Sequence, residues 1–319
     1  MSLRQSPPAL ISIAAPVYNE EELLPLFYQR IANVLRDYAF EIVFVDDGSR
    51  DRSWSVIEQI AQKDPRVKGV RFSRNFGHQP ALTAGLEHAS GEVVVLIDSD
   101  LQDPPELILD MIQKWQEGFD VVYAIRSERK GETWFKKITA TYFYRFLRHS
   151  SRLDIPLETG DFRLMSREVV QALSRLPERV RFLRGLSSWV GFKQTGIPYT
   201  RDKREAGSTK FPLFKMLKFA FDGISSFSLM PLQFATYLGM AATFLSFVIL
   251  VYSLVIRFFV ASVVPGWASL MTAIVFMGGV QLMMIGIIGE YVGRIYEEVK
   301  HRPMYIVGER IGLSETVSQ

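Results

Sequence analysis

The chain has 319 residues, of which 48% are hydrophobic and 22% are charged, and it contains no cysteine. This length and composition exclude a disordered chain, and the absence of thiols excludes a disulfide scaffold, a cysteine nucleophile and a zinc–thiolate site. The net charge of +3 is too small for a typical nucleic-acid-binding protein, so we expect no nucleic acid among its partners.

Residues 9–126 alternate short apolar runs with amphipathic stretches. The apolar runs predict strands at 9–15, 41–45, 67–72, 93–97 and 120–125, and the amphipathic stretches predict helices near 20–37, 51–63, 79–90 and 104–117. Val/Ile/Leu-rich strands separated by helices are typical of βαβ units, so we expect an α/β fold with a mostly parallel sheet. The sequence has neither a dinucleotide-binding glycine fingerprint nor a P-loop, which disfavours both of those nucleotide-binding classes.

Polar clusters follow three of these predicted strands. The clusters are Pro16-Val17-Tyr18-Asn19-Glu20, Asp46-Asp47-Gly48-Ser49 and Asp98-Ser99-Asp100-Leu101-Gln102-Asp103. Because open α/β sheets bind ligands beyond the carboxyl ends of their strands, the clusters predict a ligand site at one edge of the sheet. The alternative is that Asn19, Ser49 and Asp103 cap the helices that follow, which explains only one polar residue in each cluster.

The pair Asp98 and Asp100 needs a further explanation. In an extended segment, residues two apart point to the same side, so we expect these two carboxylates to converge. Two close carboxylates repel each other unless a cation lies between them. The pattern therefore predicts a site for a hard divalent ion, Mg²⁺ or Mn²⁺, that also binds phosphate oxygens of a substrate.

Two stretches combine basic and aromatic residues at helical spacing. They lie at about 132–149 and at 211–230. Basic amphipathic helices rich in aromatic residues favour the membrane interface, so we expect both to lie at the membrane surface. Packing against the sheet or against another subunit is the alternative.

Two long segments near the C-terminus carry no charge. The apolar cores 234–256 and 267–289 are each long enough to cross a hydrocarbon layer of about 30 Å, so they predict a transmembrane hairpin. Basic residues flank the hairpin and are scarce in its loop, which predicts a multi-pass protein of the cytoplasmic membrane with 1–210 and the tail 294–319 in the cytoplasm. Several glycines in the second segment permit close helix packing, including packing in a homo-oligomer.

Taken together, the polar clusters resemble the motifs of family 2 glycosyltransferases with a GT-A (Rossmann-like) fold. The resemblance rests on the three clusters, on Ser73-Arg74-Asn75-Phe76-Gly77, and on the extension of the third cluster through Pro104-Pro105-Glu106. With the hairpin, the chain resembles polyprenyl-phosphate glycosyltransferases, a group that includes bactoprenol glucosyltransferases and dolichol-phosphate mannose synthases. The resemblance implies an inverting transfer of a sugar from a nucleotide-sugar, with UDP-glucose expected, to a polyprenyl phosphate in the membrane. GDP-mannose and UDP-4-amino-arabinose are the alternative donors.

The resemblance also implies roles for individual residues. A nucleotide-sugar site is expected at Pro16, Tyr18, Glu20, Asp47 and Asp98, and a metal site at Asp98, Asp100 and Gln102. The expected catalytic residues are Asp100, Asp161 and Arg126, where Asp161 orients the sugar or the acceptor or acts as a base, and the alternative is a capping or ion-paired aspartate. A juxtamembrane basic loop with Arg204, Ser208 and Lys210 is expected to bind the donor and acceptor phosphates.

Two further features allow more than one interpretation: the position of His78, and the activity of the whole chain. His78 follows the Asn75-Phe76-Gly77 motif near the expected donor site, but a histidine on a surface loop is the favoured interpretation. A non-enzymatic nucleotide-binding scaffold is the alternative to an enzyme, and the intact set of Asp98, Asp100 and Gln102 argues against it.

Overall fold

A computed structural model describes residue 4 and residues 6–126, 159–179, 181–200, 230–259 and 266–313. The chain divides into two compact units. The first consists of residues 1–210 together with 303–319, and the second of residues 211–302. The first unit is therefore discontinuous in sequence, because the chain returns to it after the second.

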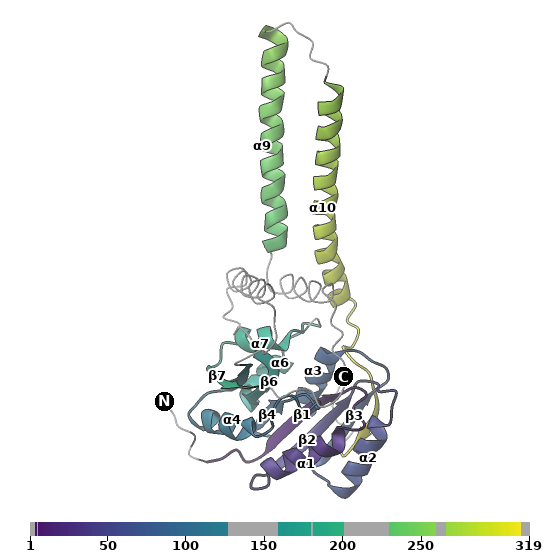
Figure 1. The fold of residues 1–319 in the computed structure, drawn as a ribbon, viewed down its shortest axis with the longest axis vertical. Coiled ribbons are helices and arrows are strands. Elements are labelled where there is room, and N and C mark those ends of the chain that lie inside the picture. The colour runs from purple at the N-terminus through teal and green to yellow at the C-terminus, as the bar shows by residue number, and fades with distance from the viewer. Residues whose placement is uncertain are drawn as a thin grey trace. The chain divides into compact units, whose positions relative to one another are not determined.

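The first unit contains one eight-stranded sheet in the order β7-β5-β6-β4-β1-β2-β3-β8 (Figure 1). Strands β1 to β4 are parallel to one another, whereas β6 runs antiparallel between β4 and β5, and β8 runs antiparallel to β3. The strands are β1 (Ile11–Val17), β2 (Phe40–Asp46), β3 (Val67–Phe72), β4 (Val93–Leu96), β5 (Val121–Arg126), β6 (Thr159–Ser166), β7 (Gln194–Tyr199) and β8 (Val307–Ile311).

Helices cover both faces of this sheet. One face packs against α1 (Leu24–Val34), α2 (Ser53–Lys63) and α4 (Leu107–Gln116) in a core that includes the fully buried Phe27 and Phe44. The other face packs against α3 (His78–His88), where Ala81 and Ala84 contact Val43 and Val45. Helices α6 (Arg167–Ser174) and α7 (Leu183–Trp189) complete the described helices of this unit. The arrangement is a three-layer α/β/α unit with a mostly parallel sheet.

The five strands and four helices expected within 9–126 are all present. Strand ends differ from the expected ones by one or two residues, and α1 begins at Leu24 rather than near residue 20. Residues 20–23 instead form a turn in which Glu20 O accepts hydrogen bonds from the backbone of Leu23 and Leu24. Proline in the first turn of α1 suits this start, because proline at that position loses no hydrogen bond within the helix.

The segment expected to be a tail, 294–319, has a defined structure in its first part. Helix α10 continues to Val299, and residues 307–311 form the edge strand β8. The aromatic ring of Tyr305 stacks on Phe72 at a centroid distance of 4.7 Å, and its hydroxyl contacts Glu87 of α3. The end of the chain is therefore an integral part of the sheet unit.

The second unit contains the two helices of the expected hairpin, α9 (Met230–Phe259) and α10 (Trp267–Val299). Their large apolar side chains are exposed, as for Phe244 at 70% and Leu282 at 72%. Among the described residues, one stretch, Phe276–Val299, is both long and apolar enough to cross a membrane, and Ala235–Ile249 is a shorter apolar stretch. The expected helix at about 132–149 lies outside the described residues, as does the expected helix at 211–230 except for its last residue.

A local ion pair joins three elements of the sheet unit. Asp64, which follows α2, accepts hydrogen bonds from the Tyr28 hydroxyl of α1 (2.8 Å) and from the backbone and guanidinium of Arg66 (3.0 and 2.8 Å). The hydrogen bonds from Arg66 outweigh burial and lower the pKa of Asp64 from 3.8 to about 2. A lowered carboxyl pKa means that this stabilisation is complete above about pH 4 and is lost as the pH falls through about 2.

We therefore expect Asp64→Asn to lower the free energy of unfolding by about 1–2 kcal/mol at pH 7, with a smaller difference near pH 3. Chemical denaturation of the detergent-solubilised full chain at both pH values measures this. Asp37→Asn is the control, because Asp37 pairs with Arg36 on the surface with both side chains about 80% exposed. Equal effects of the two substitutions at pH 7 would contradict the prediction.

Candidate functional site

The three polar clusters meet in one cleft at the carboxyl edge of β1, β2 and β4. The cleft has a volume of about 300 Å³. Six residues expected at the site line it, together with residues from the β3–α3 connection and the start of α3. The expected ones are Pro16, Tyr18, Glu20, Asp47, Asp98 and Asp100, and the additional ones include Asn75, Gly77, His78 and Ser99.

Hydrogen bonds between the first two clusters lock them together. The backbone amide of Asn19 donates to Ser49 Oγ (3.0 Å), and Asn19 Oδ1 accepts from the amide of Arg50 (2.8 Å). Asn19 has a φ of 55°, a left-handed conformation that asparagine tolerates better than most residues. The alternative that Asn19, Ser49 and Asp103 cap helices is wrong, since α1, α2 and α4 begin after Leu23, Arg52 and Glu106 without a side-chain cap.

Asp47 holds the connection between β3 and α3 in place. Its Oδ1 accepts a hydrogen bond from the amide of Phe76 (2.6 Å), and its Oδ2 accepts one from the amide of Gly77 (3.0 Å). Burial nevertheless raises the pKa of this carboxyl, and these two hydrogen bonds only partly oppose it. Asp47 thus fixes the wall of the cleft and also lines it.

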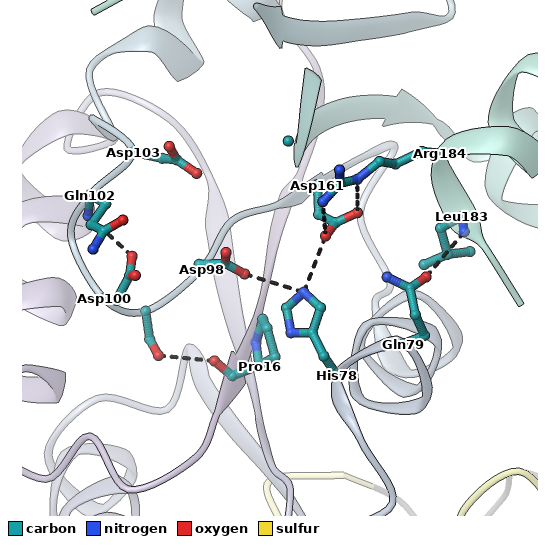
Figure 2. Close-up of polar contacts among 12 residues, drawn as sticks. Pro16, His78, Gln79, Asp98, Asp100, Gln102, Asp103, Asp161, Leu183 and Arg184 are labelled. Atoms are coloured by element: carbon teal, nitrogen blue, oxygen red, sulfur yellow. Dashed lines mark hydrogen bonds and ion pairs between the residues drawn. The ribbon is translucent and has the colours of Figure 1, made fainter. Parts of the chain in front are cut away.

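The third cluster does not continue β4, and the two acids in it do not converge. The strand ends at Leu96, and Ser99 and Asp100 form a turn in which Asp100 Oδ1 accepts a hydrogen bond from the amide of Gln102 (3.1 Å). Figure 2 shows the Asp98 carboxylate directed toward His78 and the Asp100 carboxylate beside Gln102. The expectation was wrong because it assumed an extended backbone, whereas Ser99 and Asp100 lie in a turn.

Asp98 is the acid whose surroundings best fit a cation. Its Oδ1 is buried and has no hydrogen-bond partner among the described residues. Its pKa is raised to about 6 overall. Burial is the main cause, the charges of Asp161, Asp100 and Asp103 also raise the pKa, and the neighbouring His78 lowers it. In the described part of the chain, no three His, Asp or Glu side chains come close enough to hold a metal alone. The arrangement fits an ion that takes one or two carboxylates from the protein and its other ligands from phosphate oxygens.

His78 links Asp98 to Asp161 (Figure 2). Its Nε2 lies 3.2 Å from Asp161 Oδ2 and 3.7 Å from Asp98 Oδ1. Burial lowers the pKa of His78, but the hydrogen bond to Asp161 and the charge of Asp98 outweigh it, so the pKa is raised overall. The interpretation of His78 as a surface-loop histidine is therefore wrong, because it lines the cleft as the first residue of α3.

Asp161 on β6 is bound on both oxygens by Arg184 of α7. Arg184 Nε donates to Oδ1 and Nη2 to Oδ2, both at 2.9 Å. Burial would raise the pKa of Asp161, but Arg184 and His78 overcome it and hold the pKa well below its ordinary value. A carboxylate with such a pKa is a weak base. The geometry therefore favours an orienting role for Asp161 over a general base.

Arg126, at the end of β5, contacts the end of β7 and the polar cluster that follows β4. Its Nε donates to the Tyr199 hydroxyl (3.3 Å), and its Nη2 lies 3.9 Å from Asp103 Oδ2. The Tyr199 hydroxyl also donates to Asp103, which is 1% exposed. Gly160 leaves room for this guanidinium, since a Cβ there would lie 2.8 Å from Arg126 Nη2. Arg126 is thus fixed beside β6, outside the residues that line the cleft.

The remaining expected residues divide into two groups. Gln102 is described but does not line the cleft. Arg204, Ser208 and Lys210 lie outside the described residues. Two residues that the sequence analysis did not select, Arg184 and Tyr199, hold Asp161 and Arg126 respectively. The sequence shows no local motif around either of them, because each acts through a partner far away along the chain.

Gly48 allows the second cluster to approach the β3–α3 connection. Its φ is +67°, and a Cβ would lie 2.5 Å from the carbonyl carbon of Arg74 and 2.7 Å from the nitrogen of Asn75. We expect Gly48→Ala to lower the free energy of unfolding by about 2–4 kcal/mol, because it combines backbone strain with a backbone clash.

Gly191→Ala is the matched control for this prediction. Gly191 has a φ of +76°, and apart from its two chain neighbours no atom of the described residues lies within 4 Å of the position of its Cβ, so only the strain of about 1 kcal/mol is expected. Thermal unfolding of the two variants in detergent measures the difference, and equal shifts would contradict the clash.

Comparison with known proteins places the cleft and the hairpin in a family. The model of "Glycosyl transferase family 2" matches residues 12–174, and that of "GtrB C-terminal hairpin" matches residues 230–295. An uncharacterized glycosyltransferase of Bacillus subtilis, YkcC, is 51% identical over 95% of this chain and 94% of its own length. The bactoprenol glucosyl transferase of Shigella phage SfV is 46% identical over 93% of this chain and 97% of its own.

Among solved structures, the chain is similar to the mannosyltransferase PcManGT from Pyrobaculum calidifontis in complex with GDP-Man and Mn²⁺. The two are 20% identical with a TM-score of 0.45, over 92% of this chain and 89% of the other. The family models and the two relatives cover both the strands that form the cleft and the hairpin. The chain therefore belongs to glycosyltransferase family 2 and carries the GtrB C-terminal hairpin.

Proposed function

We propose that the protein transfers glucose from UDP-glucose to the phosphate of undecaprenyl or another polyprenyl phosphate at the cytoplasmic face of a membrane. The product, a polyprenyl-phosphate sugar, would serve the modification of cell-surface glycans. The observation that carries the proposal is the 46% identity to a bactoprenol glucosyl transferase over 93% of the chain, which includes both the cleft and the hairpin. GDP-mannose and UDP-4-amino-arabinose are the alternative donors.

The proposed reaction exchanges one bond for another. An oxygen of the acceptor phosphate attacks the anomeric carbon, the bond from that carbon to the donor diphosphate breaks, and the nucleoside diphosphate leaves with the electron pair. Attack from the opposite side inverts the configuration. A phosphate monoester has a second pKa of about 6, so the attacking oxygen is largely ionised near neutral pH. The reaction therefore needs orientation and charge neutralisation more than a strong base.

We propose that residues in and near the cleft provide this orientation and charge neutralisation. Pro16, Tyr18, Glu20 and Asp47 line the part of the cleft proposed for the nucleoside. Asp161, ionised and fixed by Arg184, is placed one hydrogen bond from His78 and so from the cleft wall. We propose that it orients the sugar or the acceptor, and that Arg126, together with Arg204, Ser208 and Lys210, binds the phosphates. The cationic side chains among them suit this role through charge-assisted hydrogen bonds.

Asp98, Asp100 and Gln102 are proposed to hold Mg²⁺ or Mn²⁺ with the donor diphosphate. The buried Oδ1 of Asp98, without a hydrogen-bond partner among the described residues, supports this assignment. When bound, such an ion neutralises charge that develops on the leaving diphosphate.

We expect Asp100→Asn to reduce sugar transfer by about 100-fold or more, because it removes an anionic oxygen ligand next to the diphosphate. The assay uses full-length protein in lipid, undecaprenyl phosphate, Mg²⁺ or Mn²⁺, and each of the three labelled donors, with extraction of the lipid product. Asp110→Asn, an exposed acid on α4, is the matched control and should retain full activity. Absence of any lipid-linked sugar with wild-type protein would refute the proposed function, and normal transfer by Asp100→Asn would refute the metal assignment.

The hairpin is proposed to cross the membrane twice, with both ends of the chain in the cytoplasm. The cysteine-free sequence makes this directly testable, because a single introduced thiol has no background. In spheroplasts, we expect a membrane-impermeant maleimide to label Gly266→Cys, at the start of α10, from outside. Arg36→Cys, on the exposed surface of the sheet unit, should be labelled only after permeabilisation. The reverse pattern, or labelling of both in intact spheroplasts, would refute this topology.

A further inference from the structure

The edge strand β8 carries a glutamate whose two oxygens contact two different elements. Glu309 lies directly opposite Arg71 in the antiparallel pairing of β8 with β3. Its Oε1 accepts a hydrogen bond from Arg71 Nη1 (2.7 Å), and its Oε2 accepts one from Trp54 Nε1 of α2 (3.0 Å). These contacts join a residue of the edge strand to the neighbouring strand β3 and to helix α2.

Arg71 also faces a buried acid next to the cleft, Asp46, whose neighbour Asp47 lines the cleft. Its Nε lies 3.4 Å from Oδ2 of Asp46, which is 0% exposed. This oxygen has no hydrogen bond from the described residues, so the Arg71 guanidinium is the positive charge that faces it. Burial raises the pKa of Asp46, while its hydrogen bonds with Ser49 and the charge of Arg71 oppose that rise.

Asp46 in turn shapes the turn that borders the cleft. Its Oδ1 accepts a hydrogen bond from the amide of Ser49 (3.0 Å), which closes the turn 46–49. Ser49 Oγ accepts a hydrogen bond from the amide of Asn19. Asp47, which lies within the turn, lines the cleft. An ion chain therefore runs from Glu309 through Arg71 and Asp46 to the wall of the cleft.

We propose that Glu309 is a positioning residue for donor binding, because it holds Arg71 against Asp46 and so fixes the turn 46–49. The inference rests on the proposed function only in naming the donor as the ligand of this wall. Arg71 is 34% exposed, and without Glu309 its guanidinium is free to turn toward water. Asp46 would then keep a buried negative charge with a weakened partner, a costly arrangement that the turn relieves by opening. The C-terminal strand is thus part of the donor site through its ion chain, although it does not line the cleft.

The test uses the detergent-solubilised full chain and the variant Glu309→Gln, with Arg310→Gln as matched control. Arg310 is the exposed neighbour of Glu309 on the same strand and makes no contact in the ion chain. Hydrogen exchange of the ligand-free protein, followed in peptides that cover residues 46–51, reports on the turn itself. We expect Glu309→Gln to speed exchange there by about threefold to tenfold, since local opening follows the loss of its ion pair.

Steady-state kinetics with UDP-glucose and Mn²⁺ supply the second readout. We expect the KM for UDP-glucose to rise about threefold in Glu309→Gln, with kcat and the KM for undecaprenyl phosphate unchanged. Unchanged exchange at 46–51, or the same change in Arg310→Gln, overturns the inference. If wild-type protein does not use UDP-glucose, the proposed donor fails while the exchange experiment still decides the role of Glu309.

Discussion

The site depends on keeping negative charges together at one edge of a sheet. Asp46, Asp47, Asp98, Asp100, Asp103 and Asp161 all lie at or next to this edge. Carboxylates at such density repel one another, and burial makes the repulsion stronger. Almost every acid at this edge has a partner that stabilises its charge. Backbone amides donate to Asp46, Asp47 and Asp100, and a hydroxyl donates to Asp103, while guanidinium groups pair with Asp46 and Asp161. Asp46 Oδ2 and Asp98 Oδ1 accept no hydrogen bond among the described residues, but Asp46 Oδ2 faces the guanidinium of Arg71, whereas Asp98 Oδ1 faces the imidazole of His78.

This distribution of partners separates two kinds of acid. Asp161 and Asp103 have their charge satisfied by the protein, so they are suited to hold other groups in place rather than to accept protons. Asp98 has a raised pKa and lines the cleft, so a cation brought by the substrate would stabilise it more than the other acids. The same sheet edge thus provides a rigid frame and an electrostatically unsatisfied centre, as is common where binding energy is used for positioning.

The parts that the sequence predicts well are those with local signals. Strands β1 to β5 and helices α1 to α4 follow from apolar runs and amphipathic periods, and the polar residues after β1, β2 and β4 indicated the edge where the cleft lies. The convergence of Asp98 and Asp100 was predicted wrongly, because a turn at Ser99 and Asp100 replaces the extended backbone. His78, Arg184 and Tyr199 act through partners distant in sequence, and no local pattern marks such pairs. Strand β8 was missed because its five residues, Val307–Ile311, have an edge strand's mixed and exposed character.

The chain returns to the sheet of the first unit after the hairpin, and this has a consequence for biosynthesis. Residues 1–210 leave the ribosome first, but the edge of β3 stays without its partner until residues 303–313 have been made. An unpaired strand edge is prone to association with other chains, and domains ordinarily fold as their segments emerge. Here the hairpin must be synthesised before the sheet is complete. A newly made chain therefore finishes its catalytic unit only after its apolar helices have become available to the membrane, which orders membrane targeting before maturation of the active site.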